Sequence, residues 1–205
     1  MKKLVLPSFL LPLLVAACGS SEVNAPSPSP DNQLADADGS TLVTYVQSGS
    51  ISLKDLKDLK VVKDGRQLTD SEVQALLKEE DKRLRTQATT GSVICSTGAA
   101  LRKAFPSGRY YTRLIATCPS NVTITYMSGY AYIYNSVTGE NARGDFSGSS
   151  SPSFWVDSGV ITRRAGYYEA NGQTGAQITY VAGGTQYSGT ANYNEPGLQL
   201  YGDGN

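Results

Sequence analysis

Short apolar and aromatic runs alternate with polar positions through residues 92–205 and predict a β domain there. Runs such as 122–126, 130–134 and 177–181 are rich in β-branched and aromatic residues and are separated by Gly, Ser and Asn. A domain of this length can enclose one hydrophobic core. The pattern therefore predicts a mainly β fold, an antiparallel β-sandwich or barrel, interrupted by one short helix over 96–105 that ends before Pro106.

A charge-rich stretch, residues 41–91, precedes this domain and predicts a small helical or mixed segment. Its clearest helix begins at Thr69, because Thr69 and Glu72 have the spacing of a capping box, and Leu68 and Val73 that of a hydrophobic staple. The helix is expected to bury one apolar face and to carry (i, i+4) ion pairs on the other. The face would comprise Val73, Leu76, Leu77 and Leu84, and the pairs would be Glu79–Arg83 and Asp81–Arg85.

Residues 53–59 repeat a three-residue unit that places leucines on one broad helical face. Val61 and Val62, followed by the turn signal of Asp64 and Gly65, indicate the end of a strand. Such elements would form either a surface that docks a partner or a spacer packed on the β domain. The spacer is the interpretation that we favour.

Residues 18–40 differ in composition from the rest of the chain. They contain four acidic residues, no Lys or Arg, and three prolines within 26–30. Such a segment cannot bury enough apolar surface to offset the entropy of ordering it. It is therefore expected to be an extended, disordered linker.

The first seventeen residues have the charged and hydrophobic regions of an export signal. Lys2 and Lys3 precede an apolar run from Leu4 to Ala17. That run is shorter than the roughly 20 residues that a membrane-spanning helix needs, and it contains Pro7 and Pro12. We expect it to be a signal peptide that is removed.

Small residues lead directly into the first cysteine, as Val15-Ala16-Ala17-Cys18. This tetrapeptide resembles the lipobox of bacterial lipoproteins. The resemblance covers residues 1–18 only, and it implies cleavage before Cys18 and acylation of that cysteine by chains such as palmitate, which would anchor the protein to a membrane. Gly19, where some lipoproteins have Asp, implies the outer membrane if the cell has two membranes.

The remaining cysteines, Cys95 and Cys118, would lie in an envelope compartment where disulfides persist, and we expect them to pair. On the chain-entropy model this bond would add about 3 kcal/mol of stability. A redox-active or metal-binding pair is the alternative, but the spacing is not CxxC and the chain has no histidine.

The absence of histidine excludes Ser-His and Cys-His nucleophiles and His-ligated metal sites. Without Lys2 and Lys3 the chain carries 16 basic and 18 acidic residues, so no basic excess points to nucleic acid. A glycoside hydrolase could work with carboxylates alone. The acids of the β domain show no paired spacing, however, and we expect no enzyme, metal or cofactor; they are Glu140, Asp145, Asp157, Glu169, Glu195 and Asp203.

Tyrosine is the most suggestive residue type, since twelve of the thirteen lie within 92–205. Strand alternation places Tyr130, Tyr132 and Tyr134 on one face, either in the core or as an exposed platform. Neither Tyr110-Tyr111 nor Tyr167-Tyr168 can direct both rings inward within one strand, so some rings must lie outside. Tyrosine suits both carbohydrate stacking and protein interfaces. Our candidate binding residues are Tyr130, Tyr132, Tyr134, Tyr167 and Tyr168, whereas Trp155 is expected in the core.

Arg143-Gly144-Asp145 resembles the tripeptide by which adhesive proteins engage integrins. Because three residues match easily by chance, we expect an ordinary turn in this Gly- and Ser-rich stretch.

These patterns together predict an envelope lipoprotein, in the outer membrane of a cell with two membranes, whose β domain binds without catalysis. Another envelope protein is the favoured partner, and a cell-wall or surface glycan is the alternative. A glycan site would gather Tyr or Trp with Asn, Gln and Asp in a groove, whereas a protein site would be a flatter apolar patch.

Overall fold

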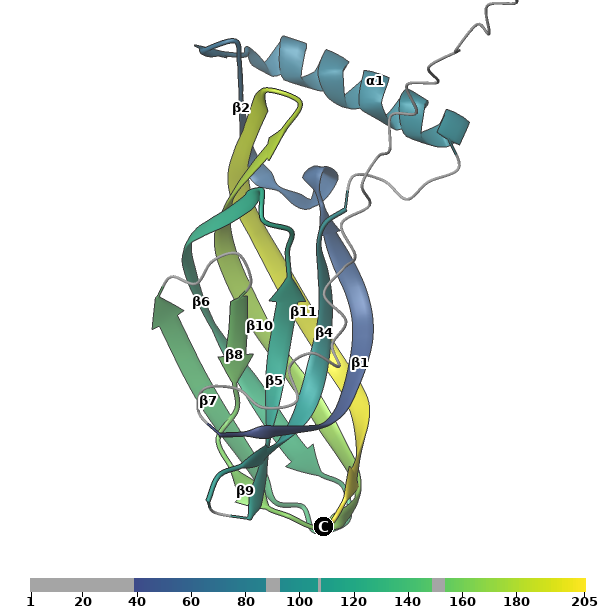
Figure 1. The fold of residues 1–205 in the computed structure, drawn as a ribbon, viewed down its shortest axis with the longest axis vertical. Coiled ribbons are helices and arrows are strands. Elements are labelled where there is room, and N and C mark those ends of the chain that lie inside the picture. The colour runs from purple at the N-terminus through teal and green to yellow at the C-terminus, as the bar shows by residue number, and fades with distance from the viewer. Residues whose placement is uncertain (1–38, 88–92, 107, 149–153) are drawn as a thin grey trace, which may run out of the picture.

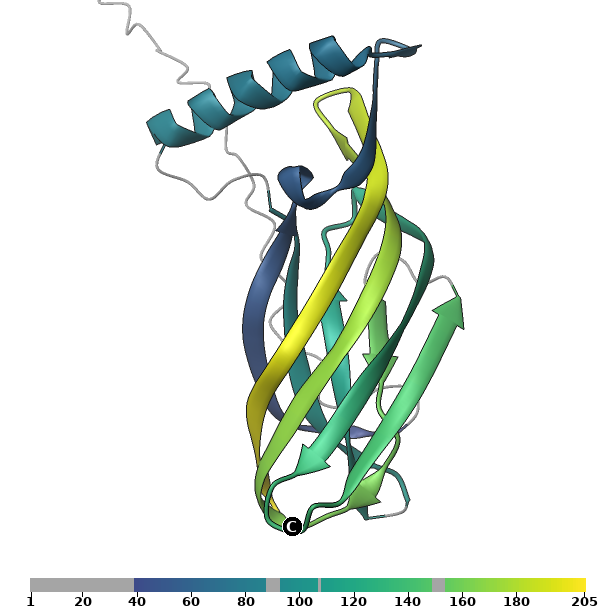
Figure 2. The ribbon, with the colours of Figure 1, turned by 180° about the vertical axis from the view of Figure 1, so that it is seen from behind.

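A computed structural model describes residues 39–87, 93–106, 108–148 and 154–205. They form two antiparallel sheets that face each other, with a single helix, α1 (Asp70–Gln87), across one end (Figures 1 and 2). The expectation of a mainly β, sandwich-like fold with a short helical segment is therefore confirmed. The export signal, Cys18 and most of the linker lie outside the described residues.

The smaller sheet has five strands, and β4 and β5 lie at its centre. The order is β1-β4-β5-β8, with β9 also paired to β5. Its strands are β1 (Thr41–Ser52), β4 (Val93–Ala104), β5 (Arg109–Thr117), β8 (Phe154–Asp157) and β9 (Ile161–Thr162).

The larger sheet has six strands in the order β3-β2-β11-β10-β6-β7. Its long central hairpin joins β10 (Ala165–Ala182) to β11 (Thr185–Asp203) through a tight turn at Gly183 and Gly184, both of which have positive φ. The other strands are β2 (Lys57–Lys63), β3 (Arg66–Gln67), β6 (Val122–Asn135) and β7 (Asn141–Gly148).

The core lies between the inner faces of the two sheets. Along β6, Ala131 and Ile133 share one face, as the alternation in the sequence predicts, and the structure turns this face inward, where both residues are fully buried. Leu101 and Leu114 come from the smaller sheet and belong to the same buried cluster, as does Tyr168 from β10. One continuous core therefore draws on both sheets.

Two seams join the sheets at their margins. On one side the hydroxyl of Thr44 in β1 donates to the Tyr201 carbonyl of β11 at 2.6 Å. On the other side β7 crosses β8 so closely that a Cβ on Gly144 would overlap the Asp157 carbonyl oxygen. A hydrogen bond from a side chain thus links β1 to β11, whereas the backbones of β7 and β8 approach each other directly.

Residues 41–67 contribute strands to both sheets, and β2 includes the strand that Val61 and Val62 indicate. The predicted helix at 53–59 is wrong, because only Leu53–Asp55 forms a turn of 3₁₀ helix and β2 begins at Lys57. Leu53 and Leu56 are buried in the core, and β2 pairs with β11. Pairing with an existing strand satisfies backbone groups that an isolated short helix would leave to water.

The predicted helix at 96–105 is also wrong, because this segment is β4. Ala99, Ala100 and Leu101 favour a helix intrinsically, but all three are fully buried in a strand between β1 and β5. Tertiary pairing on both sides has overridden the local preference.

Helix α1 begins where the sequence predicts, after Thr69. The Glu72 carboxylate accepts the Thr69 backbone N–H at 2.8 Å and the Thr69 hydroxyl at 2.9 Å. Val73 is buried, and Leu68, Leu76 and Leu77 pack partly against the core. The side chains of Leu84 and of the pairs Glu79–Arg83 and Asp81–Arg85 are not all among those described. Within the described ranges no helix is both long and apolar enough to cross a membrane.

The start of α1 gives a prediction about pH. The hydrogen bond from Arg66, at 2.7 Å, and those from Thr69 lower the pKa of Glu72 to about 2. Because this value lies below the ordinary one, the contacts stabilise the folded helix at neutral pH and are lost as the pH falls towards 2. We expect an NMR titration of the Glu72 carboxyl to give a pKa near 2, and Arg66→Gln to raise it. A Glu72 that titrates at its ordinary pKa would contradict the Arg66 contact.

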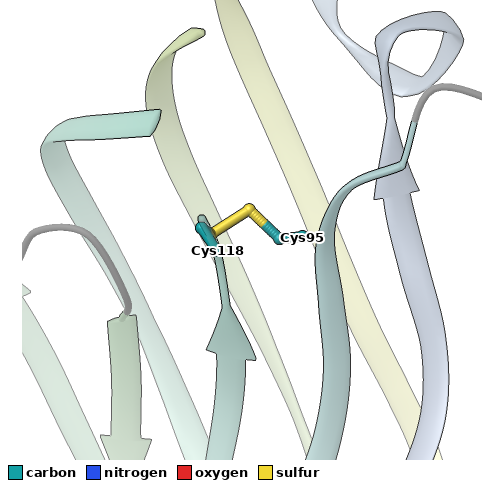
Figure 3. Close-up of a disulfide and its surroundings, with 2 residues drawn as sticks. All are labelled: Cys95 and Cys118. Carbon is teal, nitrogen blue, oxygen red and sulfur yellow. A yellow bond between two sulfur atoms is a disulfide. The ribbon is translucent and has the colours of Figure 1, made fainter. Parts of the chain in front are cut away.

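Cys95 and Cys118 form the predicted disulfide (Figure 3). Cys95 lies in β4 and Cys118 directly follows β5, and their Cα atoms are 4.2 Å apart. Both are buried in the core. The bond therefore fastens two adjacent strands of the smaller sheet at the end nearer the helix (Figure 1).

Candidate binding groove

The outer face of the larger sheet carries the predicted tyrosines. Tyr130, Tyr132 and Tyr134 point away from the core and are half-buried, while Ala131 and Ile133 between them face inward. Opposite Tyr130 stand Gln173 of β10 and Asp145 of β7. The exposed platform, one of the two arrangements that the sequence left open, is therefore the one that forms.

Two adjoining hollows cross this face, and a third adjoins them at the margin between the two sheets. The first, about 420 Å³, lies over β7 and β6. The second, about 360 Å³, lies over β6, β10 and β11 and shares Ser128, Gly129 and Tyr130 with the first. The third, about 730 Å³, lies between β11 and β1 and shares 192–194 with the second. We call these three adjoining hollows together the cross-strand groove.

The groove forms because small residues alternate with large ones along its floor. Ser128, Gly129 and Gly175 present almost no side chain, and Tyr130 rises beside them. The groove runs across the strands, so its length follows from strand spacing: β7 to β11 spans three intervals, or about 14 Å. This length accommodates more than one ring of an extended ligand.

Tyr130 is held by a charged neighbour. The Arg143 guanidinium carbon lies 3.9 Å from the centroid of the Tyr130 ring, a cation–π contact. Arg143 also donates to Asp145 at 2.7 Å, and this hydrogen bond lowers the pKa of Asp145. The tripeptide 143–145 is thus part of strand β7 and not the turn that we expected, and its two charged side chains pair with each other.

The third hollow contains a buried carboxylate. Glu195 is only 4% exposed and accepts the Tyr193 hydroxyl at 2.7 Å. Ser48 lies 2.9 Å from the same hydroxyl, and must be the donor there because the Tyr193 proton is already committed to Glu195. Burial and the neighbouring carboxylate raise the pKa of Tyr193, so its hydroxyl stays protonated at pH values where an exposed tyrosine ionises. It ties β1 to β11 at the groove margin.

The other candidate tyrosines divide into surface and core. Tyr167 is 58% exposed, and its ring meets that of Tyr201 edge-on at 5.4 Å. Tyr168 is fully buried, and its hydroxyl bonds the backbone of Arg164. Tyr168 must therefore be withdrawn as a binding residue, because strand alternation sends it into the core when Tyr167 points out.

Two further expectations about aromatic residues are wrong: that Tyr110 and Tyr111 cannot both lie inside, and that Trp155 lies in the core. Tyr110 and Tyr111 are both buried, Tyr110 in the core and Tyr111 near Arg113, whose guanidinium lies 5.7 Å from the ring. Trp155, expected in the core, is 43% exposed, while its neighbours Phe154 and Val156 occupy the interior instead. The Trp155 ring contacts Arg113 at 5.2 Å.

Sequence reasoning missed most of the polar groove residues. Gln173, Asn192 and Asn194 come from β10 and β11, and Arg143 comes from β7. Amide side chains on alternate positions of two adjacent strands were the available signal. Their convergence on Tyr130, however, depends on the register of the β10–β11 hairpin and on that between β6 and β10, whose paired residues lie more than forty positions apart.

The carboxylates of the groove already have protein partners. Asp145 pairs with Arg143, Glu195 accepts from Tyr193, and Asp55 accepts the backbone N–H of Ser52 at 2.8 Å. Across the described ranges, no group of three or more Cys, Asp or Glu side chains is placed to hold a metal ion.

Comparisons with known proteins assign no family: no family model matches the chain, and neither a curated protein nor a solved structure is significantly similar to it.

Proposed function

We propose that this chain is an envelope lipoprotein, anchored through acyl groups on Cys18, whose β domain binds a glycan chain in the cross-strand groove without transforming it. The observation that carries the glycan assignment is the convergence of Gln173, Asn192 and Asn194 beside Tyr130 in one shallow hollow. Planar amides hydrogen-bond sugar hydroxyls, and a tyrosine face packs against the C–H side of a sugar ring.

The character of the groove favours a glycan over a protein partner. A protein-binding patch would gather apolar side chains at its centre and exclude charged ones. The cross-strand groove instead places amides and the Arg143–Asp145 pair on both sides of one aromatic ring. Its length across the strands suits a linear polymer lying over several sugar units.

Binding without catalysis is supported by the state of the carboxylates. Glycoside hydrolysis needs one carboxylic acid and one base or nucleophile that both reach the scissile bond. In the groove, Asp145 is held by Arg143, and Glu195 is buried and holds Tyr193. Each of these acids therefore has a structural partner.

Replacing Tyr130 tests the glycan assignment. We expect the purified full-length protein to bind isolated cell-wall polysaccharide, and Tyr130→Ala to weaken this binding about tenfold because the stacking face is lost. Tyr126→Ala is the matched control, since Tyr126 lies on the same strand, is 46% exposed and does not line the groove. Affinity is read by titration calorimetry. Equal affinity of the two variants, or no binding by the wild type, would refute the assignment.

An envelope protein, the partner that the sequence alone favours, is the second candidate. The exposed edge-on pair of Tyr167 and Tyr201 supports it, because exposed tyrosines are enriched at interfaces. Specific retention of one envelope protein that is lost in Tyr167→Ala, with Tyr130→Ala unchanged, would favour this candidate over the glycan.

A further inference from the structure

The end of the sandwich farthest from α1 exposes apolar side chains at three separate loop tips. Phe105, directly after β4, is 75% exposed; Val137, in the β6–β7 turn, is 76% exposed; and Val160, just before β9, is 41% exposed. Arg109 pairs with Thr162 in the β5–β9 ladder, which places the first and third tips at the same end (Figure 1).

The second tip joins them through a hydrogen bond. The Glu140 carboxylate, in the β6–β7 turn, accepts the Thr162 backbone N–H at 2.9 Å. The three tips are therefore neighbours around one rim, although they come from distant parts of the chain. Apolar side chains this exposed add little to the core, and here three of them gather at one rim.

Three arginines stand among these tips. Arg109 begins β5, and Arg163 and Arg164 lie between β9 and β10. In the part of the chain that the structure describes, none of them has an ion-pair partner. The nearby acids are engaged elsewhere: Asp203 accepts from Tyr110 at 2.7 Å and faces Lys103, and Glu140 bonds Thr162. This rim therefore offers unpaired positive charge beside apolar tips.

The chain also enters the domain at this rim. A Cβ placed on Gly39, the first described residue, would lie 3.5 Å from the Phe105 ring. The twenty residues 19–38 separate it from Cys18. Fully extended they span at most about 70 Å, so the rim can meet the surface in which Cys18 is anchored.

We propose that this rim docks onto the lipid surface that holds the anchor, with Phe105, Val137 and Val160 entering the boundary between headgroups and acyl chains. Arg109, Arg163 and Arg164 then face anionic headgroups, since basic residues near such a surface are attracted to it. Separate apolar tips with basic residues between them suit a fluid interface better than a rigid protein surface. This inference rests on the proposed acylation of Cys18. It orients the domain with its long axis away from the bilayer and its cross-strand groove free.

Tryptophan fluorescence in the acylated full-length protein tests the docking. The wild type contains only Trp155, which is not at the rim, and Phe105→Trp adds a second reporter there. Val181→Trp is the matched control, because Val181 is 45% exposed at the opposite end of β10. Each protein is reconstituted in phosphatidylethanolamine–phosphatidylglycerol vesicles with and without brominated acyl chains. Mass spectrometry reports acylation of Cys18 separately.

We expect brominated lipid to quench the added fluorescence of Phe105→Trp and to leave wild type and Val181→Trp unchanged. Adding Arg109→Gln and Arg164→Gln to Phe105→Trp should reduce the quenching. An acylated, vesicle-bound Phe105→Trp protein that is not quenched more than wild type overturns the docking and leaves the anchor standing. Equal quenching of Phe105→Trp and Val181→Trp also overturns it. Absence of acyl groups and of vesicle binding overturns both the docking and the proposed acylation of Cys18.

Discussion

Gly129→Ala should lower the free energy of unfolding by roughly 3 kcal/mol, measured by urea denaturation at neutral pH. Gly129 pairs with Thr174 where β6 crosses β10 beneath the cross-strand groove. An added Cβ would overlap the Gln173 carbonyl oxygen and would lie 2.7 Å from the Thr174 Cα. Both obstacles are backbone atoms, so the central strands must separate to admit a single methyl group.

Gly175→Ala is the matched control for this prediction. Gly175 also lines the groove, but a Cβ there meets only the Asn192 side-chain oxygen, at 3.3 Å, which can rotate away. We expect its stability to remain within about 0.5 kcal/mol of wild type. If Gly129→Ala is as stable as Gly175→Ala, then β6 and β10 do not approach as closely as the structure has them.

Removal of the disulfide is expected to have a comparable effect. Replacing both Cys95 and Cys118 with alanine should lower the free energy of unfolding by about 3 kcal/mol, because the unfolded chain regains the freedom of a loop closed over a separation of 23 residues. Alanine is preferred to serine because both sites are buried and an unpaired hydroxyl would add its own cost.

A reductant provides the control for the disulfide. Denaturation of the wild type should shift to lower urea when a thiol reductant is present, whereas the double variant should not respond to it. A wild type whose midpoint is unchanged by reduction, with free thiols confirmed by alkylation, would contradict the contribution assigned to this bond.

The cross-strand groove and the disulfide lie in different parts of the fold. The Ser48–Tyr193–Glu195 hydrogen bonds close the margin between β1 and β11, and the disulfide holds β4 beside β5. The groove floor itself contains no disulfide and relies on strand pairing among β6, β10 and β11. Loss of the disulfide should therefore reduce stability more than it alters the groove in molecules that remain folded.

Local sequence chemistry was sufficient to predict several features of this protein. The alternation of apolar and polar residues predicted the β architecture and placed Tyr130, Tyr132 and Tyr134 on one face of β6, because a strand has a period of two. The spacing of Thr69 and Glu72 predicted the start of α1, since a capping interaction involves only neighbouring residues. With Cys18 assigned to acylation, only one pairing of the other cysteines remained, and the structure confirms it.

Other features were decided by tertiary structure. The segment around Ala99–Leu101 has a helical composition but is a strand, because β1 and β5 pair with both of its edges. Trp155 lies outside because Phe154 and Val156 occupy the inward positions of β8. The cross-strand groove depends on registers that bring Asn192, Gln173 and Tyr130 side by side from three strands. Sequence periodicity indicates which face a residue occupies, whereas only the packing of distant segments determines its neighbours on that face.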